Sequence, residues 1–233
     1  AEAMMALSSE QGFPHFVAEG IFLRGWALVE QGQEEEGVVQ IRQGLAAVRA
    51  MGSEVTRQHW LVLLAEACGK VGRTGEGLAL LAEALDAGHK SGQSMWEAEL
   101  YRIKGTLTLQ QANQKAKGKR QKKLSVASSQ LSVADPRPLT PDPQGEAEAC
   151  FLKAIEIAQK QQAKSLELRA VMSLVRLRQH QVQDHASRNT QHEARPRLDE
   201  AHKLLSEIYN WFIEGFDTKD LQEAKALLEE LRD

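Results

Sequence analysis

The sequence predicts an all-α protein in which antiparallel helix pairs stack into a right-handed superhelical array of about four repeats, closed by a C-terminal capping helix. The first observation is a repeat: Gly12, Gly52 and Gly92 lie forty residues apart, and each follows a helical stretch. The second is that apolar residues recur at three- and four-residue spacing between short glycine-containing turns. The third is a composition of 42% hydrophobic and 26% charged residues, which is typical of a folded helical protein.

The forty-residue shift relates many further positions. A small residue recurs on the first helix of each pair, where two helix axes approach closely only if no side chain stands between them. The related positions are Gly25, Ala65 and Gly105; Leu23, Leu63 and Ile103; Gly32 and Gly72; Gly37 and Gly77; and Leu45 and Leu85.

The first half of the chain contains two complete repeats. Residues 1–12 match the end of a second helix, so we interpret them as the remainder of a preceding repeat. Repeat 1 covers 13–52, with helices expected at 16–31 and 34–51, and repeat 2 covers 53–92, with helices at 56–71 and 74–90. Exposed apolar residues in 1–12, such as Met4, Met5 and Leu7, would favour self-association.

Repeat 3 covers 93–162 and is interrupted. Its first helix opens with the capping-box spacing of Ser94 and Glu97 and is expected to end near residue 112. A disordered basic and proline-rich insertion is expected at 113–143, because four of the six prolines lie in it. The second helix of the pair resumes at 145–162.

Repeat 4 and a final helix complete the array. Repeat 4 covers 163–213, with helices expected at 164–183 and 197–212 around a polar loop at 184–196. The capping helix covers 217–233, and its polar outer face would cover the last apolar surface of the stack.

These positions resemble tetratricopeptide repeats, in which a small residue on the first helix, glycine at the turn and a small–large–small series on the second helix recur. The matching residues are Gly25, Gly32, Gly37, Ile41 and Gly44; Ala65, Gly72, Gly77, Leu81 and Ala84; Gly105, Ala147, Phe151 and Ala154; and Ser173, Ala201 and Leu205. The forty-residue period is longer than the usual period of about 34 residues, and the proline that commonly closes the second helix is absent.

Three segments are similar to the C-terminal repeat region of large bacterial predicted ATPases and cyclase-type or transcriptional regulators. They begin at Leu23 (LRGWAL), Ala163 (AKSLELRA) and Glu214 (EGFDTKDLQEAK). This resemblance implies a non-catalytic, partner-binding regulatory module of a larger signalling protein.

The preferred functional prediction is a protein or peptide ligand in the concave groove of the array. In the family the inward positions surround the recurring small residue, which implies a groove lined by Glu19, Phe22, Trp26, His59, Val62, Glu66, Glu99, Arg102 and Thr106. These residues suit a basic or amphipathic ligand. Phe22 and Trp26 are either an apolar anchor for it or part of the packing core.

Two alternative functions remain open. The array could sense a small molecule and relay its bound state to an upstream ATPase or cyclase domain. Nucleic acid could instead attach to a basic loop, although a merely solvated loop explains the same run and no aromatic residues are interleaved for base stacking. The basic residues are Lys115, Lys117, Lys119, Arg120, Lys122 and Lys123.

No enzyme, cofactor or metal site is predicted. The sequence contains no phosphate-binding Gly-x-x-x-x-Gly-Lys-Ser/Thr motif. His180, His185, His192 and His202 lack cysteine neighbours and His-x3-His spacing. With a net charge of -3, only Cys68 and Cys150 as cysteines, and neither a membrane span nor a secretion signal, the sequence favours a cytoplasmic protein that does not bind membranes.

Overall fold

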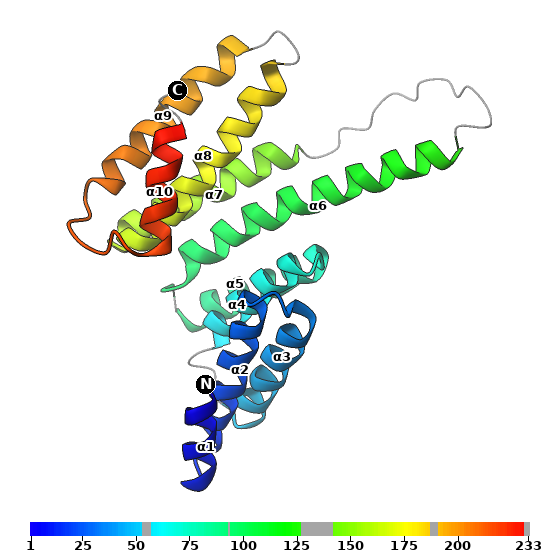
Figure 1. The fold of residues 1–233 in the computed structure, drawn as a ribbon, viewed down its shortest axis with the longest axis vertical. Coiled ribbons are helices and arrows are strands. Elements are labelled where there is room, and N and C mark those ends of the chain that lie inside the picture. The colour runs from blue at the N-terminus through cyan, green and yellow to red at the C-terminus, as the bar shows by residue number, and fades with distance from the viewer. Residues whose placement is uncertain (53–56, 93, 127–141, 187–190, 231–233) are drawn as a thin grey trace. The chain divides into compact units, whose positions relative to one another are not determined.

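The computed structural model describes residues 1–52, 57–92, 94–126, 142–186 and 191–230, and within these ranges the chain is all-α (Figure 1). It divides into two compact units. The first comprises Ala1–Trp96 with Gln110–Ala127, and the second comprises Glu97–Leu109 with Ser128–Asp233. The prediction of one continuous array over 1–233 stays a prediction, and each unit is described by itself.

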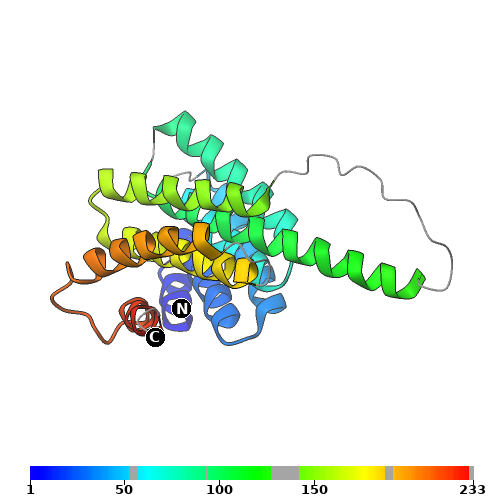
Figure 2. The same ribbon diagram turned by 90° about the horizontal axis from the view of Figure 1, so that it is seen from above.

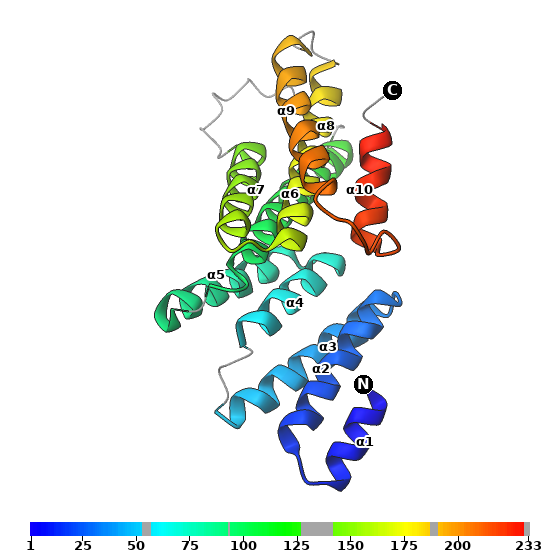
Figure 3. The same ribbon diagram turned by 90° about the vertical axis from the view of Figure 1, so that its left-hand side faces the viewer.

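The first unit is built from helices that pack in chain order (Figure 3). Its helices are α1 (Glu2–Glu10), α2 (Pro14–Glu30), α3 (Glu34–Ala50), α4 (Arg57–Lys70) and α5 (Thr74–Ser91). Helix α2 packs on α3 and α4 packs on α5, as the helix-pair pattern predicts, while α1 lies on α2 and α3 contacts α4. Their shared core contains Ala18, Phe22, Val29, Val38, Ile41, Val48, Trp60, Leu64, Ala67 and Cys68.

The periodic glycines form left-handed turns at helix ends. Gly12, Gly52 and Gly92 have φ angles of 72°, 74° and 70°. Gly32 and Gly72, also forty residues apart, have φ angles of 82° and 79° and end the turns inside the two helix pairs. A side chain strains this conformation, so glycine is favoured at each turn where the backbone reverses, and the glycines therefore recur with the repeat.

The recurring small residue marks the closest approach within a pair. A Cβ atom added to Gly25 would lie 2.6 Å from the Ile41 backbone nitrogen and 2.7 Å from the Gly37 carbonyl oxygen. A Cβ atom on Gly105 would lie 2.6 Å from the Phe151 ring. The predicted contact role is therefore confirmed at both glycines, and Ala65 at the equivalent place is fully buried.

The second unit packs the first part of α6 (Glu97–Val126) with α7 (Pro143–Lys160), α8 (Lys164–Ala186), α9 (Gln191–Tyr209) and α10 (Lys219–Glu230). Helix α8 contacts both α7 and α9, and α10 lies against α8 and α9 (Figures 1 and 3). Their core lies around Phe151, Leu168, Leu174, Leu205 and Leu221. Helix α7 starts where Pro143 follows Asp142, whose side chain accepts a hydrogen bond of 3.1 Å from the Gln144 backbone N–H.

The expected insertion at 113–143 requires correction. Helix α6 continues without a break to Val126, seen as the long green helix in Figure 2, and α7 already begins at Pro143. The segment 113–126 contains lysine, glutamine and alanine but no proline, so an established helix extends through it at little cost. Residues 127–141, which include Pro136, lie outside the described residues.

The expected loop at 184–196 also requires correction. Helix α8 extends to Ala186, and α9 begins at Gln191, five residues before Pro196. The rest of the expected loop, 187–190, lies outside the described residues. No helix in the described ranges combines the length and apolar character that crossing a membrane requires.

Candidate functional site

Phe22 belongs to the core of the first unit and does not line a groove. Its side chain is 1% exposed and stacks on Trp60, with ring centroids 4.3 Å apart and an interplanar angle of 23°. Trp26, one turn later, is half-buried under Lys70, whose ammonium lies 5.2 Å from the ring centroid. Of the two roles considered for Phe22 and Trp26, a ligand anchor or part of the packing core, Phe22 therefore has the second.

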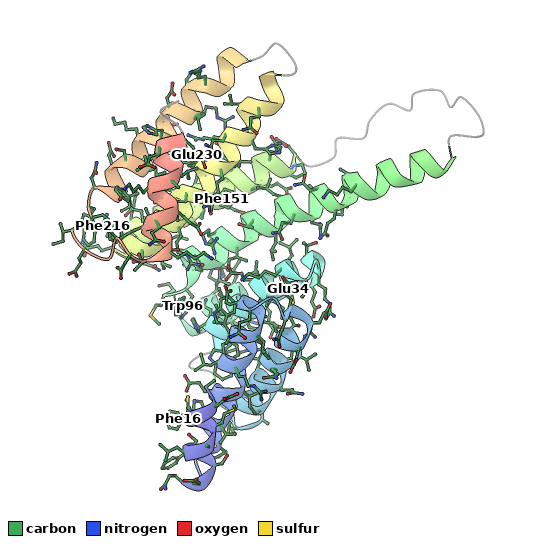
Figure 4. The ribbon with its side chains drawn as sticks, in the orientation of Figure 1. Phe16, Glu34, Trp96, Phe151, Phe216 and Glu230 are labelled. Atoms are coloured by element: carbon green, nitrogen blue, oxygen red, sulfur yellow. The ribbon has the colours of Figure 1, made fainter. Side chains whose placement is uncertain are left out.

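The other predicted groove residues of the first unit differ in accessibility. Val62 is buried, whereas Glu19, His59 and Glu66 are partly exposed. The His59 ring lies 4.1 Å from the Trp96 ring, just before α6 (Figure 4), and burial lowers the pKa of His59. The neutral imidazole is thus favoured, which suits a packing contact better than a charged ligand contact.

The remaining three predicted residues, Glu99, Arg102 and Thr106, lie on α6 in the second unit. Glu99 is buried, and Arg102 grips it in a fork, with Nε 2.8 Å from Oε2 and Nη2 2.7 Å from Oε1. The Thr106 hydroxyl donates a 3.1 Å hydrogen bond back to the Arg102 carbonyl. These side chains are engaged within the unit, and that they line a groove for a ligand stays a prediction.

Glu99 is the centre of an ion-pair network. Arg169 from α8 lies 3.0 Å from the Glu99 carboxylate and 3.8 Å from the carboxylate of Asp220 on α10. Burial alone would raise the pKa of Glu99, but the hydrogen bonds and charge of Arg102, together with the charge of Arg169, outweigh burial and lower it. The network joins α6, α8 and α10 electrostatically.

We expect the free energy of unfolding to fall less steeply at acid pH in Glu99→Gln than in wild type. A carboxyl whose pKa is depressed by folding stabilises the fold above its ordinary pKa of 4.5, and this contribution is lost as pH falls through the folded-state pKa. Urea unfolding between about pH 7 and about pH 3 measures the slope. Glu229→Gln, in an exposed 4.0 Å pair with Lys225, is the control. Equal slopes for wild type and Glu99→Gln below pH 4.5 would contradict the assignment.

The predicted basic loop is helical where it is described. Lys115 and Lys117 lie on α6 and are exposed, and the Lys115 ammonium donates a 2.8 Å hydrogen bond to Gln111. The backbone of 119–123 continues the helix, but its side chains lie outside the described residues, as do those of His185 and His192. Among the side chains that the structure describes, no three histidine, cysteine or acidic groups gather as a metal site would require.

Sequence reasoning missed an aromatic surface in the turn between α9 and α10. Trp211, Ile213 and Phe216 are 58%, 90% and 45% exposed, and Figure 4 shows Phe216 on this turn. We call these three residues the C-terminal aromatic surface. The run Trp-Phe-Ile-Glu-Gly-Phe was the available signal, because three aromatic residues are unusual in a short connection between helices.

The C-terminal aromatic surface has a fixed backbone. Gly215 adopts a left-handed φ of 77°, and the Thr218 N–H and hydroxyl both donate to its carbonyl, at 2.9 and 2.7 Å. The Phe216 ring contacts Tyr209 at 5.8 Å, and the Lys164 ammonium lies 6.0 Å from the Trp211 ring centroid.

A small cavity of about 180 Å³ lies beside Trp211. Its polar lining includes Gln159, Lys164 and Glu167, and the Glu167 carboxylate accepts from Lys164 at 2.8 Å and from Gln159 at 3.0 Å. Because these three side chains already hydrogen-bond to one another, they form a fixed polar border beside the C-terminal aromatic surface.

No family model and no curated protein matches this sequence.

Proposed function

We propose that this protein is a non-catalytic module that binds another protein, and that the C-terminal aromatic surface is its binding site. The observation that carries the proposal is the exposure of Trp211 and Ile213 on an ordered turn. Exposed apolar groups in water are unfavourable, and tryptophan dominates the binding energy of many protein interfaces.

The charge around the surface favours a particular partner. Glu207, Glu214 and Asp217 are exposed beside the aromatic residues, and the only described cation against the Trp211 ring is Lys164. A partner segment with both basic and apolar side chains would complement this surface. The predicted preference for a basic or amphipathic ligand is thus kept, and its location moves from the groove to the turn.

Contacts between successive repeats support the stacked, tetratricopeptide-like architecture that we propose for the module. Lys70 pairs with Glu30, forty residues earlier, and the Thr74 hydroxyl donates a 2.9 Å hydrogen bond to Gln114, forty residues later. Such contacts at the repeat distance are expected when each helix pair lies on its predecessor. Together with the resemblance to bacterial signalling ATPases, they favour a regulatory module within a larger cytoplasmic protein.

A photocrosslinking amino acid placed at Ile213 tests this function in cells that make the protein. We expect a discrete crosslinked product whose captured segment is basic and amphipathic, and Trp211→Ala should reduce its yield about tenfold or more, as for an interface hot spot. The same crosslinker at Lys203, which is exposed on α9, is the matched control. A set of products identical to that from Lys203, or an acidic captured segment, would refute the proposed site.

A further inference from the structure

Two cavities in the first unit occupy equivalent places in successive repeats. One is lined by Ser8, Ser9, Val17 and Ile21, together with neighbouring residues of α1, α2 and α3. The other is lined by the residues found forty positions later, Val48, Arg49, Arg57 and Leu61, together with neighbours on α3, α4 and α5. The cavity is therefore a product of the repeat packing, placed where one helix pair meets the first helix of the next.

The second of these cavities, which we call the seam cavity, differs in its charge. Its apolar lining includes Leu45, Leu61, Leu64 and Leu80, and it encloses about 260 Å³. Arg49 and Arg57 stand where the first cavity has Ser9 and Val17, and Arg42 adds a third guanidinium. Repetition alone explains the hollow but does not explain the arginines.

Two of the three arginines are held by carboxylates. Arg42 pairs with Glu76, and Arg57 pairs with Glu83, which also lines the seam cavity. Arg49 is exposed and forms no ion pair with any residue in the described ranges. Among the residues that the structure describes, no carboxylate compensates this guanidinium at the mouth of the apolar cavity, which suits a ligand with a single negative charge.

We propose that the seam cavity binds a small amphiphile with a carboxylate headgroup and a short alkyl chain. The leucine side chains would contact the chain, and Arg49 would bind the carboxylate with Arg57 nearby. The volume lies just below the usual range of ligand cavities, which begins at about 300 Å³, so a chain of about eight carbons fits better than a membrane lipid.

The location gives such a ligand a structural consequence. It would contact α3 of one helix pair and α4 and α5 of the next, so binding would stabilise the junction between two repeats. This inference does not rest on the C-terminal aromatic surface, which lies in the other unit.

Calorimetric titration of the full chain with octanoate, octanol and octylammonium tests the headgroup. We expect octanoate to bind with a millimolar or submillimolar Kd, as is usual for a ligand of about ten non-hydrogen atoms. Octanol and octylammonium should bind at least about tenfold more weakly, because neither supplies an anion. Equal binding of octanol and octanoate, or no octanoate binding at any soluble concentration, would overturn the proposal.

Three variants locate the site. Arg49→Gln should weaken octanoate binding about tenfold, whereas Arg24→Gln, which alters an exposed arginine of α2 outside the cavity, should leave it unchanged. Ala46→Leu, at the mouth, should block binding while hydrogen exchange shows α3 and α4 still folded. Equal loss in Arg49→Gln and Arg24→Gln, or undiminished binding by folded Ala46→Leu, would show that octanoate binds elsewhere.

Discussion

Replacing Gly25 with leucine is expected to destabilise the first unit by about 3 kcal/mol, at the upper end of the range for overpacked cores. Both atoms that the new Cβ would strike, the Ile41 nitrogen and the Gly37 oxygen, belong to the backbone of α3 and cannot rotate away. Removing a glycine from a helix favours folding by only about 1 kcal/mol. The cost of the clash with α3 is larger, so the variant should be less stable than wild type. The helices of the pair would have to separate.

Hydrogen exchange of the α2 and α3 amides in increasing urea measures this loss locally, because two compact units need not unfold together. Gly118→Ala is the matched control, since it also removes a helical glycine but its Cβ would meet nothing within 4 Å. That variant should be neutral or slightly stabilising. If Gly25→Leu left exchange in α2 and α3 as slow as in wild type, the close approach of these helices would be wrong.

The repeat explains why the helix pairs could be predicted from the sequence. Turns such as those at Gly12 and Gly52 need a left-handed residue, and close helix contacts need a small one. Each requirement fixes the residue type at one position of every repeat, so glycine and small residues recur at a constant spacing that can be recognised in the sequence. The all-α class follows from the same pattern and is confirmed in the described ranges.

The path of 113–126 could not be predicted in the same way. Its charge density was interpreted as disorder, but lysine and glutamine are good helix formers, and an elongating helix avoids the cost of nucleation. The prolines that argued for a loop begin only at residue 136. Local propensity therefore decided the conformation of 113–126, and the composition of the whole segment was a poor guide.

The candidate site was harder to predict because the groove positions came from a resemblance, whereas exposure depends on neighbouring elements. Phe22 and Trp26 are spaced to share a helix face, yet Trp60 from the next repeat covers Phe22. The C-terminal aromatic surface lies in a connection, where helical periodicity gives no information. Two arginines of the seam cavity, Arg42 and Arg49, share α3, but Arg57 and the leucines of α4 and α5 join them only through packing.

The buried ion pairs of the second unit also lack a sequence signal. Glu148 on α7 and Arg178 on α8 are thirty residues apart, and their side chains are 7% and 6% exposed. Two guanidinium nitrogens of Arg178 lie 3.2 and 3.1 Å from the same Glu148 oxygen, and Arg197 from α9 pairs with the other oxygen. Desolvating these charges is costly, so the network stabilises the unit only while it is complete.

We expect Glu148→Ala to destabilise the second unit by about 3 kcal/mol, at the lower end of the range for a broken buried pair. The Arg178 guanidinium would lose its buried carboxylate and keep only the exposed carboxylate of Glu200, which lies 3.1 Å away. Urea unfolding with hydrogen exchange of α7 and α8 measures the change. Arg176→Ala, which breaks the exposed 2.7 Å pair with Glu223, should cost no more than about 1 kcal/mol.

A double variant separates the pair itself from the charge left behind. Replacing Glu148 and Arg178 together with methionine removes both buried charges while keeping much of their volume, so stability should recover in part from the loss in Glu148→Ala. Recovery should be incomplete, since Arg178 also donates to the Arg197 carbonyl, which would lose this donor. If Glu148→Ala cost no more than Arg176→Ala, water would be reaching Arg178, and burial of the network would not be what joins α7, α8 and α9.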